Sequence, residues 1–165
     1  MDKLAAVLLF TSQGVPFIHG GQEFLRSKFG EHNSYNQPDS INMIRWELKQ
    51  KNYDIFEYYK VLIELRKNHP MFKMTDVNQI KKNINIFSKV PQNCIAFTIN
   101  NSETGDDWSE VLILLNPNRA EIKFEVPNKK WNVVVSDQKA GEEIIETIES
   151  SKITVKPISG MVLYH

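Results

Sequence analysis

The pattern of apolar and polar positions changes at His69–Pro70, so the chain divides into two parts. Residues 1–12 are rich in Leu, Ala and Val with almost no polar face, which predicts a helix buried on most sides. Val15–Ile18 is a short apolar run between glycines, as expected for a strand buried on both faces of a sheet. Residues 54–68 carry apolar side chains every three or four positions, which predicts a second helix capped by Asp54.

Beyond residue 70 the apolar runs are short, β-branched and separated by turn-forming clusters, such as Pro127–Asn128. Their spacing of roughly 8 to 12 residues is typical of an all-β antiparallel sandwich, which we predict over residues 71–165. The predicted strands are Ile84–Val90, Cys94–Ile99, Val111–Leu115, Ile122–Val126, Trp131–Val135, Ile144–Ile148, Ile153–Val155 and Met161–Tyr164.

The first 70 residues do not make a complete fold by themselves. A strand covered on both faces belongs in a parallel sheet of several strands, and no second strand is predicted before residue 71. We therefore expect the chain to be part of a larger protein. Because the Val15–Ile18 strand would lack its neighbours, we also expect the chain to self-associate, or its N-terminal segment to be disordered or rearranged.

Charge and cysteine content disfavour several classes of function. The 20 basic and 20 acidic residues cancel, so no net charge favours binding to nucleic acid or to an anionic membrane surface. The longest apolar run, Leu4–Phe10, has seven residues, whereas a membrane-spanning helix needs about 20. Cys94 is the single cysteine, so no internal disulfide can form, and we expect its side chain to be buried. The localisation, cytoplasmic or secreted, stays open.

Two ordered motifs connect the first part of the chain to a known family. One runs from Gly14 to Arg26 (GVPFIHGGQEFLR) and continues at Asn33–Asn36 (NSYN), and the other begins at Pro38 (PDSIN) and reaches Trp46. In these motifs the chain resembles type I pullulanases, which are debranching members of the α-amylase superfamily. The resemblance is strong over roughly the first 72 residues, and the remainder resembles the C-terminal β domain of that superfamily.

The resemblance implies that residues 1–70 form the C-terminal end of a catalytic (β/α)8 barrel. Residues 1–12 would be the end of its seventh helix and Val15–Ile18 its eighth strand, whose neighbours would lie elsewhere in the barrel. Active sites of such barrels lie in the loops that follow the strands. The loop GEHNSYNQPD, residues 30–39, would therefore border the substrate cleft.

The resemblance also implies that the reacting groups lie outside this chain. Retaining glycosidases use a carboxylate nucleophile and a carboxylic acid. In the resembled family these are an aspartate after the fourth strand and a glutamate after the fifth, assisted by an aspartate after the seventh. All three would precede Met1, so we predict no catalytic residue here and a structural role for Glu23. We predict no cofactor, and no ligand spacing supports a metal site.

Polar and aromatic side chains of this loop suit the recognition of sugar hydroxyls. Amides both donate and accept hydrogen bonds, and a carboxylate accepts them from neighbouring hydroxyls. Each residue also has an ordinary role. Asn and Asp are common in turns, Asp39 would serve equally well as a cap after Pro38, and Tyr35 could pack beneath the loop. The candidate substrate-binding residues are Asn33, Tyr35, Asn36, Asp39 and Asn42.

Three functions are compatible with these patterns. The first is a hydrolase of α-1,6-glucosidic branch linkages in pullulan, glycogen or starch dextrins, in which this chain alone is inactive. The second is a stand-alone carbohydrate-binding or interaction module, in which Trp108 or Trp131 stacks on a glucan. The third is a β domain that only shields the barrel. One departure from the family affects the finer sugar preference: Arg45 stands where an aspartate is usual.

Overall fold

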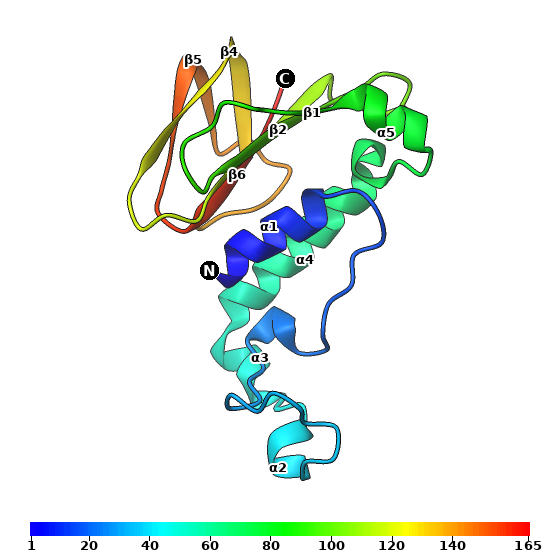
Figure 1. The fold of residues 1–165 in the computed structure, drawn as a ribbon, viewed down its shortest axis with the longest axis vertical. Coiled ribbons are helices and arrows are strands. Elements are labelled where there is room, and N and C mark those ends of the chain that lie inside the picture. Colours follow the sequence, from blue (N-terminus) through cyan, green and yellow to red (C-terminus); the bar gives the residue numbers. More distant parts are fainter.

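A β-sheet, a pair of helices and a small lobe of loops follow one another along the long axis of the molecule (Figure 1). The computed structural model describes residues 1–165. The helices are α1 (Asp2–Thr11), α2 (Asp39–Asn42), α3 (Glu47–Lys51), α4 (Tyr53–Asn68) and α5 (Val77–Asn83), with short 3-10 turns η1 (Gln22–Phe24) and η2 (Pro70–Lys73). The strands are β1 (Ile84–Ile86), β2 (Ile95–Asn100), β3 (Glu110–Asn116), β4 (Ile122–Val135), β5 (Glu146–Val155) and β6 (Ser159–Tyr164). None of the helices combines the length and apolar character needed to cross a bilayer.

The six strands form one antiparallel sheet in the order β1-β2-β3-β6-β4-β5, which confirms the predicted antiparallel β domain. Eight predicted runs become six strands, because the runs on each side of Pro127 both belong to β4 and the last two runs before β6 merge largely into β5. The turn expected at Pro127 is instead a register shift between Glu125 and Lys129. A β-bulge can accommodate a proline, because the bulged residue does not have to donate a backbone hydrogen bond to the neighbouring strand.

Each face of the sheet has its own core, because successive side chains of a strand point to opposite faces. On β3, Leu112 and Leu114 point to one side and Val111 and Ile113 to the other. The first side is a cluster of 12 buried residues enclosed by the curl of the sheet, where Phe124 and Trp131 of β4 pack. The second side is a larger cluster of 19 buried residues, which the sheet shares with the helices.

Helices α1 and α4 lie side by side across this second face (Figure 1). Leu62 of α4 is buried in the shared core, as the apolar spacing predicted, and so are Val7 and Phe10 of α1. The side of α1 that carries Ala5 and Leu8 is exposed, so this helix is not buried on most sides as predicted. Helix α1 approaches β6 closely at Gly160, where an added Cβ would lie 3.1 Å from Cγ1 of Val7. The core therefore crosses the point at which the sequence pattern changes.

The start of α4 and the segment after η2 differ from the prediction. Asp54 does not cap α4, since the residue before the helix is Asn52 and no side chain caps it. The Asp54 carboxylate instead lies 3.5 Å from Lys3 Nζ of α1. Helix α5 was not predicted; its cap is Asp76, whose Oδ1 accepts hydrogen bonds from the next turn's backbone. Seven residues are too few for a clear helical repeat.

The strand predicted at Val15–Ile18 is not formed. The segment is irregular, and Val15 and Phe17 are 95% and 89% exposed. Pairing would need a neighbouring strand, and the six strands of this chain form a separate sheet on the far side of the helices (Figure 1). An apolar run is thereby left at the surface.

Arg66 of α4 binds the end of α1. Its guanidinium donates to the backbone oxygens of Phe10, Ser12 and Gly14 at 2.6 to 2.8 Å, and the residue is only 6% exposed. These carbonyls lie in the last turn of α1 and just after it, where a cation also complements the helix dipole. Burial lowers the pKa of Arg66 from its ordinary value. Arg66 therefore fixes the two helices relative to each other.

Replacing this guanidinium will destabilise the protein. For Arg66→Met we expect the free energy of unfolding to fall by about 3 kcal/mol, because the carbonyl oxygens lose charged donors in a buried place. The control Lys67→Met, at an exposed neighbour, changes it by no more than about 0.5 kcal/mol. Urea unfolding followed by circular dichroism measures both. Equal stability of the two variants would contradict the role given to Arg66.

Candidate functional site

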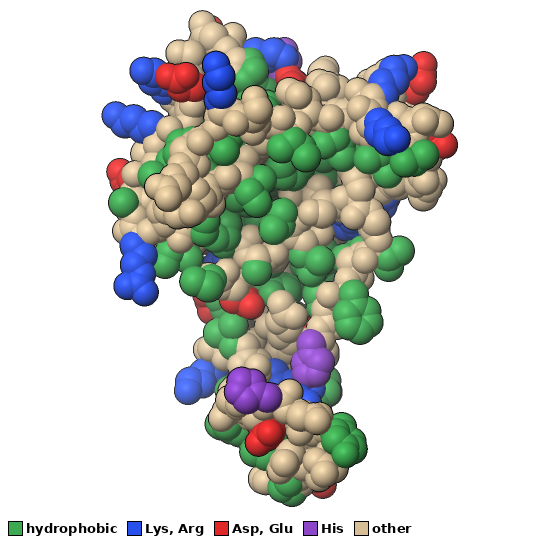
Figure 2. All heavy atoms as spheres, in the orientation of Figure 1, with side chains coloured by type: hydrophobic (Ala, Val, Ile, Leu, Met, Phe, Trp, Pro, Cys, Tyr) green, Lys and Arg blue, Asp and Glu red, His purple; other side chains and the backbone are tan.

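The predicted substrate loop lies in the lobe farthest from the sheet, between η1 and α3 (Figure 1). Apolar and histidine side chains reach the surface of this lobe (Figure 2). Between η1 and α3, the exposed residues include Phe29, His32 and Tyr35. In the chain, the lobe is linked to α1 by residues 12–21 and to α4 by α3. Its position leaves the loop open to solvent on the outer side.

Four of the five candidate residues present their side chains to solvent. Asn33, Asn36 and Asp39 are exposed, and Tyr35 is 83% exposed. Asp39 is the first residue of α2, a helix that has no side-chain cap, so the capping role considered for it is not the one it has. These four side chains are accessible to a ligand.

Asn42, the fifth candidate, is engaged within the chain. Its Nδ2 donates to the backbone oxygens of Ser34 at 2.6 Å and Gln37 at 2.8 Å. Its Oδ1 accepts a hydrogen bond from Lys28 Nζ at 3.0 Å, and its backbone oxygen accepts one from Arg26. The structure thus brings Asn42 together with two basic residues that the sequence analysis had not singled out. The only available signal was a pair of basic residues two positions apart, just before the loop.

The turn before the loop is tightly built around Gly21. This residue has φ of +91°, and an added Cβ would lie 2.8 Å from Cβ of Arg26. Its backbone N–H donates to Oε2 of Glu23 at 3.0 Å, so the glutamate closes the turn. Arg26 also donates to the backbone oxygen of Gly20 at 3.0 Å. A side chain at Gly21 would displace Arg26 and disturb the turn.

Two amides attach this turn to α4. Gln22 Nε2 donates to the Tyr59 hydroxyl at 3.2 Å, and Asn52 Nδ2 donates to the backbone oxygen of Phe24 at 3.1 Å. Phe24 itself is buried, 1% exposed, and packs against Trp46 with ring centroids 5.8 Å apart. The lobe is therefore anchored to the helix pair by both polar and apolar contacts.

Arg45, where the resembled family usually has an aspartate, orders the surface of the lobe. Its guanidinium lies over the ring of Phe29, 4.7 Å from the centroid, and it donates to the backbone oxygen of Ser40. A cation over an aromatic face is a favourable contact. The positive charge therefore lies beside the candidate loop.

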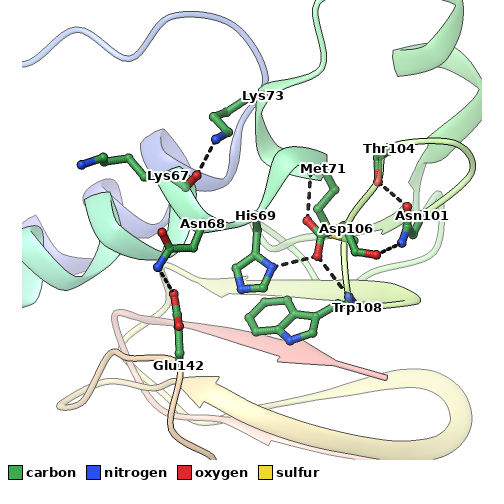
Figure 3. A network of polar contacts seen from close by, with 10 residues as sticks. All are labelled: Lys67, Asn68, His69, Met71, Lys73, Asn101, Thr104, Asp106, Trp108 and Glu142. Carbon is green, nitrogen blue, oxygen red and sulfur yellow. Dashed lines mark hydrogen bonds and ion pairs between the residues drawn. The ribbon is translucent and has the colours of Figure 1, made fainter.

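Trp108 is not an exposed sugar platform. It is only 9% exposed and is stacked between His69, at 3.5 Å between ring centroids, and Tyr164, at 4.3 Å. Figure 3 shows the indole beneath His69, at the junction of α4 and the sheet. The alternative that gave this residue a glucan-stacking role is wrong.

Asp106 organises the same junction (Figure 3). Its side chain is fully buried, and Oδ1 lies 2.8 Å from Nδ1 of His69. Its two carboxylate oxygens also accept hydrogen bonds from the backbone N–H groups of Met71 and Trp108. A buried carboxylate with several donors is well satisfied, so this network has a structural function.

Trp131 is likewise unavailable for stacking on a sugar. It is fully buried in the core inside the curled sheet, and its Nε1 donates to the backbone oxygen of Pro127 at 3.1 Å. With both tryptophans buried, the stand-alone carbohydrate-binding module loses the residues on which it depended.

A groove of about 760 Å³ lies away from the lobe, between α4 and residues 138–145. Acidic side chains line it, including Glu57, Glu64 and Glu142. No group of three or more His, Cys, Asp or Glu side chains is arranged to hold a metal ion. Burial raises the pKa of Tyr58, which borders this groove, and of Cys94, which is buried as predicted.

Comparison with known proteins gives consistent matches. The family model described as the pullulanase all-beta domain matches residues 80–139. A pullulanase of Bacillus subtilis (strain 168) is 30% identical over 163 residues, which are 99% of this chain and 22% of the relative. An isoamylase of a Flavobacterium species is 29% identical and covers 78% of this chain and 20% of the relative.

Solved structures agree with these sequence matches. Pullulanase from Bacillus acidopullulyticus has a TM-score of 0.92 and 37% identity, over 99% of this chain and 20% of that one. Pullulanase type I from Bacillus subtilis str. 168, complexed with maltose, has a TM-score of 0.89 and 27% identity, over 99% of this chain and 23% of that one. The chain thus spans about a fifth of the length of the relatives it matches.

The burial of Trp108 can be checked against the exposed Trp46, which is 67% exposed. We expect Trp108→Ala to lower the free energy of unfolding by about 3 to 5 kcal/mol, as for other buried aromatic residues. Trp46→Ala should lower it by about 1 kcal/mol or less. Urea unfolding measures both. A smaller effect at Trp108 than at Trp46 would show that the stack between His69 and Tyr164 is not formed.

Proposed function

Because this chain is related in sequence and in fold to the C-terminal portion of pullulanases, we propose that it is part of a glycoside hydrolase that debranches α-glucans. The linkages cleaved are the α-1,6-glucosidic branch points of pullulan, glycogen or starch dextrins. The single observation that carries this proposal is the match over 99% of the chain, at 37% identity, to a pullulanase about five times as long. Relatives named isoamylase support the same class of substrate.

In this proposal, residues 1–70 complete a (β/α)8 barrel that the longer protein supplies. Val15–Ile18 would be the eighth strand and α1 the end of the seventh helix. The exposure of Val15 and Phe17 supports this, because an apolar run without a strand partner is costly in water and gains both hydrogen bonds and burial in a parallel sheet. The same exposed run gives the isolated chain a reason to self-associate.

The exposed side chains of the lobe are the proposed sugar contacts. Asn33, Asn36 and Asp39 offer groups that bond hydroxyls, and Tyr35 offers an aromatic face for a pyranose ring. Pullulanases among the structural neighbours carry maltose, maltotriose and maltotetraose, which supports an α-glucan as the ligand. The loop would then form part of the rim of the substrate cleft.

The reacting carboxylates would come from the rest of the barrel. Retention of configuration needs a nucleophile and an acid about 5 to 5.5 Å apart on the two sides of the scissile bond. Glu23 closes the turn at Gly21, and Asp39 lies on an exposed helix. We therefore propose that neither of them takes part in bond cleavage and that the chain alone is inactive.

The inactivity of the isolated chain gives a direct assay. We expect no release of reducing sugar from pullulan by the purified chain, and release by the longer protein that contains it. Hydrolysis by the isolated chain that disappears in Glu23→Gln or Asp39→Asn would show that the chain carries its own catalytic carboxylate.

Sugar contact by Asp39 predicts a change in KM. In the longer protein, we expect Asp39→Asn to raise KM for pullulan about threefold to tenfold, with kcat within about twofold, as for an interaction present in both ground and transition state. The control Asp107→Asn changes another exposed aspartate, on the loop before β3, and should leave both constants unchanged. If Asp39→Asn has the same KM and kcat as the control, Asp39 does not contact the substrate.

Self-association of the isolated chain should depend on the exposed apolar run. We expect light scattering to give a mass that rises with concentration, and a mass near that of the monomer for Phe17→Asp. The control Thr75→Asp adds the same charge at another exposed position and should still associate. A wild-type chain that remains monomeric at every concentration would contradict the expectation.

A further inference from the structure

The polar contacts of Asn42 suggest a role different from direct contact with a sugar. We propose that Asn42 is a positioning residue, whose carboxamide holds the substrate loop in the shape that presents Tyr35, Asn36 and Asp39 to an α-glucan. The substrate named here rests on the proposed function. The ordering of the loop by Asn42 rests on the hydrogen bonds alone.

The first step is the geometry of the turn. Residues 34–37 form a tight turn, in which Gln37 N–H donates to the Ser34 oxygen at 3.0 Å. Tyr35 and Asn36 are the two central residues of this turn, and both are exposed. Asn42 Nδ2 donates to the carbonyl oxygens at both ends of the turn, Ser34 and Gln37. The NH2 group of Asn42 therefore holds both ends of the turn, and Tyr35 and Asn36 lie between them.

The second step connects Asn42 to Asp39. Helix α2 consists of these two residues and the two between them. Its backbone is closed by bonds from Asn42 N–H to the Pro38 oxygen at 3.1 Å and from Met43 N–H to the Asp39 oxygen at 2.8 Å. Because α2 has only one turn, the placement of Asn42 also places Asp39. All three exposed residues thus depend on one side chain.

The third step connects the loop to the body of the protein. Lys28 donates to Asn42 Oδ1 and to the Ser34 hydroxyl, and Arg26 donates to the Asn42 backbone oxygen. Arg26 packs on the turn at Gly21, which α4 holds through the Gln22 contact. Asn42 is therefore the point at which a path of contacts from the helices reaches the loop.

A carboxamide is the group that fits this place. The side chain at position 42 has to donate two hydrogens to the two carbonyl oxygens and to accept a hydrogen bond from Lys28. Only an amide carries two donor hydrogens and an acceptor on one short side chain. A carboxylate would keep the acceptor and lose both donors. With all three of these contacts made inside the chain, Asn42 has little capacity left for a sugar hydroxyl, in contrast to the exposed Asn33.

The test uses Asn42→Asp, which keeps size and the contact with Lys28, and Asn42→Ala, which removes every side-chain contact. The control Asn78→Asp makes the same chemical change on α5, at an exposed position outside the lobe. Hydrogen exchange of the purified chain follows the backbone amides of Gln37 and Met43. We expect both Asn42 variants to exchange about tenfold faster there, because opening the turn becomes easier, and the amides of β3 to remain unchanged.

Kinetics of the longer protein then separate positioning from mere folding. We expect Asn42→Asp to raise KM for pullulan about threefold to tenfold with kcat within about twofold, as for loss of uniform binding, and Asn78→Asp to behave as the wild type. Unchanged exchange at Gln37 in both Asn42 variants would overturn the proposal. Faster exchange with unchanged KM would overturn it too, since the loop order would then not matter to the substrate. If the unmodified longer protein does not hydrolyse pullulan, the proposed function fails, while the exchange result still decides whether Asn42 orders the turn.

Discussion

The packing of α1 and α4 against one face of the sheet is the contact on which the rest of the structure depends. It buries the larger of the two cores, to which both the helices and the strands contribute. Arg66 fixes α1 relative to α4 from within, and the Asp106 network with the His69 and Trp108 stack closes the far end of α4 on the sheet. Helical and β residues therefore form one structural unit, and α4 is a fixed base for the lobe.

The candidate site is held at a distance from this core by a short series of polar contacts. Gln22 and Asn52 attach the turn of η1 to the helix pair, and Asn42 with its basic neighbours attaches the loop to that turn. These amides are partly buried, and their hydrogen bonds to the chain give the loop a defined shape without a core of its own. The exposed candidate side chains of the loop are thereby both accessible and ordered, and an ordered site loses less entropy when it binds a ligand.

Much of this could be predicted where the sequence pattern and the local structure depend on the same residues. The apolar repeat in residues 54–68 predicted α4, and the short β-branched runs predicted the strands. Both predictions were possible because the hydrophobic periodicity of a helix or a strand depends on residues close together in the sequence. Features that depend on distant partners could not be predicted. Val15–Ile18 has the composition of a strand but no strand to pair with, Pro127 lies in a bulge rather than a turn, and Trp108 is covered by residues far away in sequence. Within the candidate site, the sequence motif identified the loop. Only the structure showed that the Asn42 side chain faces inward and the Tyr35 side chain faces solvent.

The central claim is that this chain supplies the rim of an α-glucan cleft to a barrel built mostly from other residues. The structure of the longer protein with bound maltotetraose tests it most directly. The account predicts a glucosyl unit in contact with Tyr35 and Asp39, and Val15–Ile18 hydrogen-bonded between strands of a barrel. A sugar bound away from residues 30–42, with Val15–Ile18 still unpaired at the surface, would contradict it.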